Sequence, residues 1–261
     1  MITIKTKEEI AILREGGRRH AEIMRALVSM VKTGISTLDL ENEAQKLIKA
    51  GGDGTDKPAF LNYSPRGAKR PYPAALCISI NNQVVHGIPN EDPQVLKDGD
   101  IVTLDMGLVH KGMYTDMAVT VPVGGADKTS KQAMRLVNTA KEALKAGIKA
   151  ARGGAKIGDI GAAIERIVYP TGFAIIPELC GHGVGYSVHE DPYVPNYGNA
   201  GTGEVLRPGM VLAIEPILAE KGPRIKLSKD GYTYVTADGG LAVQEEHTIV
   251  ITKGEAEILT L

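Results

Sequence analysis

An internal repeat most restricts how this chain of 261 residues can fold. Segment 33–40 matches segment 153–160, with glycine at 34 and 154 and aspartate at 39 and 159, an offset of 120 residues. Two later matches follow in the same order: 85–89 with 188–192, and 99–105 with 209–215. Chance similarity among glycine-rich loops could explain any one match, but it does not explain three matches in the same order. The repeat therefore predicts two equivalent halves.

Each half is predicted to contain a long helix, a short helix and strands that end near a carboxylate. Hydrophobic spacing, caps and breakers predict helices over 6–33, 37–52, 130–151 and 158–168, strands over 76–80, 100–108, 113–121, 210–219 and 241–252, and a proline-rich loop over 53–75. We expect an α+β fold in which one curved antiparallel sheet is backed by four helices. Residues 1–261 are predicted to form a single domain, with pseudo-repeats over about 6–122 and 126–252.

The composition argues against several classes of protein. The formal net charge is −1, from 30 basic and 31 acidic side chains, which is not the basic excess of a nucleic-acid-binding protein. No apolar run approaches the roughly 18 residues of a membrane helix. The two cysteines, Cys77 and Cys180, suit a reducing compartment better than a disulfide framework. We expect a cytoplasmic protein with no specific nucleic-acid partner and no membrane attachment.

Two aspartates interrupt consecutive apolar strands. Asp105 and Asp116 flank a short turn, which can centre on either of two positions and so place Asp116 opposite residue 105 or residue 107. Both registers keep the two carboxylates on one face of the sheet. Burying them is costly unless they are paired or bind metal. The alternative is an exposed face on which each carboxylate meets water.

Two glutamates and one histidine extend this set. Glu215 lies in an almost continuous apolar run, Glu245 and Glu246 must point to opposite faces so that one is expected in water, and His182 lies in a glycine loop. A histidine in such a loop is alternatively a simple turn residue. Four carboxylates balance two divalent cations, and oxygen ligands with one imidazole favour Mn, Fe or Co, with Zn also suitable. Such a site prepares water to attack a carbonyl.

These motifs resemble those of type I methionine aminopeptidases, M24 metallopeptidases with the pita-bread fold. The resemblance covers essentially the whole chain. It rests on Val85 to Pro89, Gly99 to Asp105, Thr115-Asp116, Gly181 to Gly185, Val188-His189-Glu190, Ile214-Glu215-Pro216 and Glu246-His247-Thr248. The resemblance implies removal of the N-terminal methionine from nascent proteins and peptides, by attack of metal-bound hydroxide on the first peptide carbonyl. It implies a monomer that acts on nascent polypeptide N-termini and leaves contact with the ribosome open.

The resemblance also implies roles for individual residues. Two divalent ions (Co, Mn, Fe or Zn) would be bound by Asp105, Asp116, His182, Glu215 and Glu246, with Asp116 and Glu246 bridging. Glu215 would relay a proton, His86 would lie near the substrate amine, and His189 would hydrogen-bond the scissile amide and the oxyanion. Substrate-binding positions are His86, Phe60, Tyr63, Tyr72, Cys77, Val188, His189 and Tyr232.

The pocket departs from the family pattern at three places. Val188 replaces a bulky Phe, Phe60 replaces a small Cys, and residues 64–71 include about six more residues than usual. Two alternatives remain open. An Xaa-Pro aminopeptidase or dipeptidase shares the five ligands but usually carries a large additional N-terminal domain. A catalytically dead module of the same fold would bind partners or RNA, but such proteins lose ligands.

Overall fold

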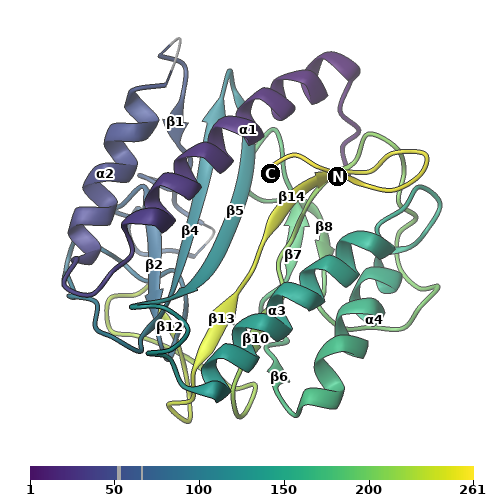
Figure 1. Cartoon of the computed structure of the whole chain (residues 1–261). Helices are drawn as coiled ribbons and strands as arrows, with labels where there is room; N and C mark the ends of the chain where they lie inside the picture. The colour runs from purple at the N-terminus through teal and green to yellow at the C-terminus, as the bar shows by residue number, and fades with distance from the viewer. Residues whose placement is uncertain (52–53, 66) are drawn as a thin grey trace.

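Four α-helices cover one side of a layer of antiparallel strands in the computed structural model, which describes residues 1–261 except 52–53 and 66 (Figure 1). The helices are α1 (Lys7–Met30), α2 (Thr37–Lys49), α3 (Lys131–Ala150) and α4 (Ile157–Val168), followed by a 3₁₀ turn, η1 (Tyr169–Thr171). The strands are β1 (Lys57–Pro58), β2 (Leu76–Ile80), β3 (Gln83–Val85), β4 (Ile101–His110), β5 (Met113–Pro122), β6 (Ala174–Ile175), β7 (Gly181–Gly183), β8 (Glu190–Val194), β9 (Val211–Ile214), β10 (Ile217–Ala219), β11 (Ile225–Leu227), β12 (Tyr234–Thr236), β13 (Ala242–Gln244), β14 (His247–Val250) and β15 (Glu257–Ile258). No helix among the described residues has the length and apolarity needed to cross a bilayer.

The long and short helices begin and end close to the predicted positions. A capping box begins α1 at Thr6, because the Thr6 hydroxyl accepts from the Glu9 amide at 3.2 Å and the Glu9 carboxylate accepts from the Thr6 amide at 2.7 Å. Helix α1 ends at Met30, before the predicted stop at Gly34. Helix α2 ends at Lys49, and Gly52, which was predicted to help end it, lies outside the described residues.

The repeated segments adopt matching local structures. Gly34 and Gly154 have φ of +88° and +89°, a conformation that favours glycine. Their amides donate to the carbonyls of Leu96 and Leu206, both at 2.9 Å. Each glycine thus ties the loop between two helices to the segment that leads into a central strand. The boundaries of the pseudo-repeats and the single-domain organisation stay predictions.

Each helix pair packs against its own strands. One buried apolar cluster joins α1 and α2 to β2 and β4, and another joins α3 and α4 to β9 and β14. Fully buried members of the two clusters include Met24, Leu27, Leu40, Leu104, Leu136, Ile160, Leu212 and Ile249. Because each such side chain contributes roughly 1.5–3 kcal/mol on burial, the two clusters hold the strands rigidly from behind.

The strand pairing decides between the two registers of the aspartates. All named pairs are antiparallel, and in the pair of β4 with β5 Asp116 lies opposite Gly107 while Asp105 lies opposite Ala118. The carboxylates therefore share one face, one diagonal step apart. Between the halves, the Glu246 amide donates to the Ala118 carbonyl at 2.9 Å, which joins β5 to the segment before β14.

Two strands predicted as continuous are each divided. Segment 210–219 forms β9 and β10, and segment 241–252 forms β13 and β14. β9 pairs with β14 and β10 pairs with β13, so residues 215–216 and 245–246 leave the ladder together. Pro216 has no amide hydrogen to donate, which explains part of the interruption. Glu215 and Glu246 therefore lie at the break between the two ladders, where the Glu245 amide still donates to the Pro216 carbonyl at 3.3 Å.

Candidate metal centre and active site

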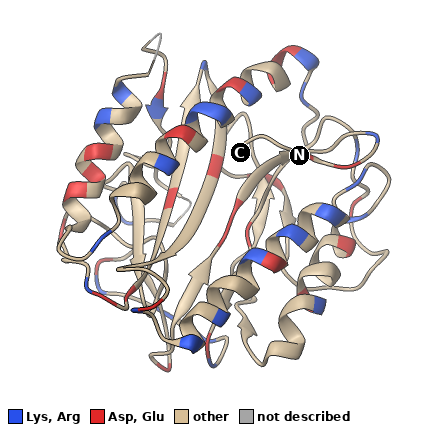
Figure 2. Ribbon diagram, in the orientation of Figure 1, with Lys and Arg blue, Asp and Glu red and all other residues tan. Residues whose placement is uncertain are grey.

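Five side chains predicted as ligands approach one another from five segments. Asp105 lies on β4, Asp116 on β5, His182 on β7, Glu215 directly after β9 and Glu246 directly before β14. All five are buried, and all five line one cavity of about 690 Å³. Figure 2 shows acidic segments within the central strands, whereas Lys and Arg lie mostly on helices and loops. The fold thus concentrates negative charge where basic side chains are sparse.

The closest part of this cluster has the spacing of a metal site. One ligand atom each from Asp116, His182 and Glu246 lies within 4.8 Å of the others. Nε2 of His182 lies 3.5 Å from a Glu215 carboxylate oxygen and 3.9 Å from one of Asp116. Nδ1 of His182 lies 2.9 Å from the Gly183 carbonyl, so Nδ1 carries the proton and the Nε2 lone pair faces the carboxylates.

The electrostatics of the cluster fit divalent cations. Burial raises the pKa of Asp105 to about 7, and burial together with neighbouring carboxylates raises the pKa values of Asp116, Glu215 and Glu246 well above their ordinary range. Burial lowers the pKa of His182 to about 3, which keeps its imidazole neutral. Among the described residues, Oδ1 of Asp105 and Oε1 of Glu246 have no hydrogen-bond partner. Buried oxygens without donors are suited to metal.

Gln244 also belongs to the site, although no sequence motif indicated it. Its amide donates to Oε2 of Glu215 at 3.1 Å. The alternation of side chains along a strand could have predicted this position, because Gln244 lies two residues before Glu246 and therefore on the same face. Gln244 holds Glu215 in place without adding charge.

Glu245 is not in water, contrary to the expectation that one of the adjacent glutamates is solvated. Both are buried, Glu245 at 6% and Glu246 at 2% exposure. A Glu245 oxygen accepts from the Thr120 amide at 3.2 Å and lies 3.9 Å from Nζ of Lys141 on α3. Burial raises the Glu245 pKa to about 8. The second carboxylate therefore faces the helix layer, which sequence alternation alone does not reveal.

Two further histidines line the same cavity. Nδ1 of His189 lies 2.9 Å from the Tyr63 hydroxyl, and the His189 ring lies edge-on to His182 with centroids 4.5 Å apart. His86 follows β3 with φ of +59°, an uncommon value that turns it out of the strand. Burial lowers the His86 pKa to about 4. Both imidazoles can therefore serve as hydrogen-bonding groups beside the carboxylates.

A cluster of apolar and aromatic side chains, the apolar wall, lines the same cavity as the carboxylates. The predicted substrate-binding residues that line it are Phe60, Tyr63, Tyr72, Cys77, His86, His189 and Tyr232. Val188 does not line the cavity but packs in the same apolar cluster. Gly107 makes room for this wall, since a Cβ there would lie 2.8 Å from Cε1 of Phe60. Within the longer loop 64–71, Pro65 lines the cavity and Arg66 lies outside the described residues.

Known proteins with similar sequences and structures are peptidases. Residues 11–253 match the model of metallopeptidase family M24. The chain therefore belongs to metallopeptidase family M24, a family of hydrolases. It is 42% identical over 261 residues to a methionine aminopeptidase of Aquifex aeolicus (strain VF5), covering 99% of this chain and 98% of that protein.

Solved structures agree with the pita-bread fold. The crystal structure of methionine aminopeptidase from Thermotoga maritima matches 100% of this chain and 99% of that chain, with a TM-score of 0.92 and 41% identity. A prolidase from Pyrococcus horikoshii OT3 matches 99% of this chain but 63% of its own, with a TM-score of 0.74 and 23% identity, a likeness of fold alone. The predicted fold class is confirmed.

Proposed function

We propose that this chain is a methionine aminopeptidase that removes the N-terminal methionine from nascent proteins and peptides. One observation carries the proposal: a cavity of about 690 Å³ brings the five predicted ligands, two histidines and an apolar wall together. The carboxylate side suits a charged reacting centre, and the apolar side suits a methionine side chain. The similarity to methionine aminopeptidases over the full chain supports this assignment.

The five predicted ligands would hold two divalent ions, Co, Mn, Fe or Zn. When bound, the ions supply an activated water and polarise the scissile carbonyl. The ligand set is Asp105, Asp116, His182, Glu215 and Glu246. Their four negative charges match two divalent cations. Because burial raises the carboxyl pKa values in the metal-free site, cation binding and proton release are coupled.

Glu215 and the two histidines outside the ligand set bind the substrate and move protons. With the Tyr63 hydroxyl donating to Nδ1 of His189, the proton of His189 lies on Nε2, where it can be donated to the developing oxyanion. Glu215 carries a proton to the amine of the leaving peptide. The Gln244 amide donates to Oε2 of Glu215, which fixes the orientation of this carboxylate. His86 accepts a hydrogen bond from the substrate α-amine.

The proposal is tested with metal-reconstituted protein and two peptides. We expect release of Met from Met-Ala-Ser and little cleavage before proline in Ala-Pro. Failure to release Met, or a preference for Ala-Pro, would contradict the proposal. The second outcome would favour an Xaa-Pro peptidase, the alternative to which the prolidase likeness points. Adding a chelator serves as the control, because hydrolysis that persists without metal would not come from this site.

The apolar wall makes a separate prediction about specificity. Replacing Phe60 by Ala is expected to lower kcat/KM for Met-Ala-Ser by about 10- to 100-fold, since a lost apolar contact in a pocket is worth 1–3 kcal/mol. Most of the loss should appear in KM. Tyr193→Ala is the matched control, because Tyr193 also lines the cavity but is 75% exposed. Equal losses in both variants would remove Phe60 from the methionine pocket.

Location and partners form part of the proposal. We infer a cytoplasmic monomer that meets polypeptide N-termini as they leave the ribosome, with no specific nucleic-acid partner. The near-neutral net charge and the intact ligand set support this, since a module used only for binding partners or RNA would not need four buried carboxylates around one imidazole. Sedimentation of the pure protein with and without ribosomes tests it.

A further inference from the structure

The segment before α1 contains a buried ion pair that the proposed reaction does not use. Nζ of Lys5 lies 2.7 Å from Oε2 of Glu190, and the two side chains are 1% and 8% exposed. The Lys5 amide also donates to the Gly209 carbonyl at 2.8 Å, which holds the backbone beside the second half of the chain. A buried pair of this kind adds little net stability, because the desolvation of both ions offsets their attraction. The position of the ion pair in the fold therefore says more about its role than its contribution to stability does.

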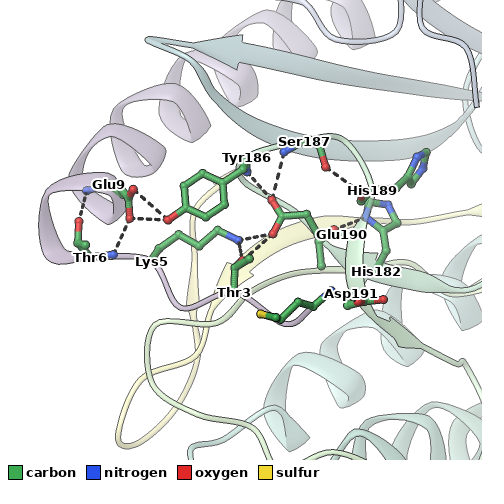
Figure 3. A network of polar contacts seen from close by, with 12 residues as sticks. Thr3, Lys5, Thr6, Glu9, His182, Tyr186, Ser187, His189, Glu190 and Asp191 are labelled. Atoms are coloured by element: carbon green, nitrogen blue, oxygen red, sulfur yellow. Dashed lines mark hydrogen bonds and ion pairs between the residues drawn. The ribbon is translucent and has the colours of Figure 1, made fainter.

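Glu190 organises the turn that carries His189 (Figure 3). One carboxylate oxygen of Glu190 accepts from Lys5 and, at 2.6 Å, from the Thr3 hydroxyl. The other oxygen accepts from the Tyr186 amide and, at 3.1 Å, from the Ser187 amide. One side chain thus binds both the N-terminal segment and the backbone of the turn.

Hydrogen bonds connect the turn to His189 and to the N-terminal segment. The Ser187 hydroxyl donates to the His189 carbonyl at 2.8 Å. The Lys5 ammonium lies 4.8 Å from the centre of the Tyr186 ring, and the Tyr186 hydroxyl donates to Glu9 at 2.9 Å. The residue before the turn, Gly185, has φ of +138°, and a Cβ there would collide with the stem of Lys5. The N-terminal segment and the turn therefore fit together closely.

We propose that Lys5, with Thr3, is a positioning residue for His189 and acts through Glu190. The direct neighbour of Glu190 in the chain is the imidazole that faces His182, so the ion pair sets where that imidazole lies. The proposal rests on the role of His189 in the proposed function. It explains why a charged pair links a turn of the site to a segment about 185 residues away.

The first test is a double-mutant cycle on metal-saturated protein. We expect Lys5→Met to lower kcat for Met-Ala-Ser by about 10- to 100-fold, since small misplacements of a catalytic group cost up to 10²-fold. KM and metal affinity should stay within about twofold. In a His189→Ala background, Lys5→Met should have no further effect on kcat, because coupled residues are not additive. Additive losses, or an unchanged kcat, would overturn the proposal.

The matched control is Arg14→Met. Arg14 forms an ion pair with Glu257 that also ties the N-terminal region to a distant strand, but the pair is exposed and does not touch the turn. We expect its kcat to equal that of the wild type. If Lys5→Met does not fold, Thr3→Val takes its place, because it removes one donor to Glu190 and no charge. A loss of about tenfold is then expected, and no loss would overturn the proposal.

A second readout does not depend on turnover. In the zinc-loaded protein with ¹⁵N-labelled histidine, the His189 ring signals are assigned by their disappearance in His189→Ala. Lys5→Met should shift those signals, and Arg14→Met should not. Unshifted signals would overturn the positioning role. A wild type that releases no Met would instead overturn the proposed function, while the ring signals would still decide whether Lys5 positions the imidazole.

Discussion

Replacement of Glu215 by Gln is expected to lower kcat for Met-Ala-Ser by about 10³-fold and to leave the protein folded. The substitution removes the proposed proton carrier, and general acid–base catalysis contributes 10²–10⁴-fold. Gln keeps the size of the side chain, so packing around Gln244 is preserved. Steady-state kinetics gives kcat, and circular dichroism with thermal unfolding shows whether the fold persists.

Metal loading must be measured in the same samples, because Glu215 is also a proposed ligand. Elemental analysis after saturation with Mn separates loss of metal from loss of proton transfer. Glu22→Gln is the control carboxylate, since Glu22 lies at the surface in a pair with Arg18. If Glu215→Gln turns over at the wild-type rate with full metal content, Glu215 has no catalytic role.

Removing metal is expected to make stability strongly dependent on pH. In the metal-free protein the pKa values of Asp116, Glu215 and Glu246 are well above those of an unfolded chain, mainly because the carboxyls are buried. The folded state therefore holds protons that unfolding releases, and stability falls as pH rises. Between pH 7 and 8 the loss should be about 1.4 kcal/mol for each carboxyl that stays protonated in the folded state, and less for one that ionises in this range.

The buried histidines do not titrate between pH 7 and 8. Their effect on stability has the opposite sign and occurs at lower pH. Burial lowers the pKa values of His86 and His182 to about 4 and about 3, so both are neutral when folded, and unfolded histidine is mostly neutral above pH 7. Urea unfolding at pH 7 and 8, with chelator and with saturating Mn, gives the two slopes. Metal should reduce the slope, because bound carboxylates are ionised. Equal slopes in both conditions would refute the prediction.

Asp116→Asn provides the matched variant for this experiment. It removes one buried carboxyl with a raised pKa and nearly preserves volume. Metal-free Asp116→Asn should therefore lose less stability between pH 7 and 8 than the wild type, and it should gain less from Mn. A variant that behaves like the wild type in both respects would place Asp116 outside the metal cluster.

The chemistry of the site was largely readable from local patterns. Asp105, Asp116 and Glu215 interrupt apolar strands, and a buried carboxylate needs a partner whatever the fold. The helices were predictable for a similar reason, because caps such as Thr6 and stops such as Gly154 act within a few residues. Local rules of this kind do not depend on the arrangement of distant segments.

Other features depend on contacts between distant segments and were not predictable. The ladder gap at 215–216 and 245–246 arises because two strands leave it together, and neither strand shows this alone. The burial of Glu245 depends on helix α3, and the link from Lys5 to Glu190 spans most of the chain. In the last two cases, the tertiary packing determines which group lies beside the charged side chain. A pattern along the sequence does not contain that information.

The sequence by itself determined the repeat, the four helices, the longest strands and the residue types that suit two cations. It did so because periodicity, capping and the cost of burying charge are local properties. Only the tertiary structure decided that Asp116 lies opposite Gly107, that Gln244 holds Glu215, and that the N-terminal segment closes onto the turn of His189. These contacts depend on strand register and on packing between the two halves. Many strand registers and packings satisfy the same local rules, so the local rules do not select one of them.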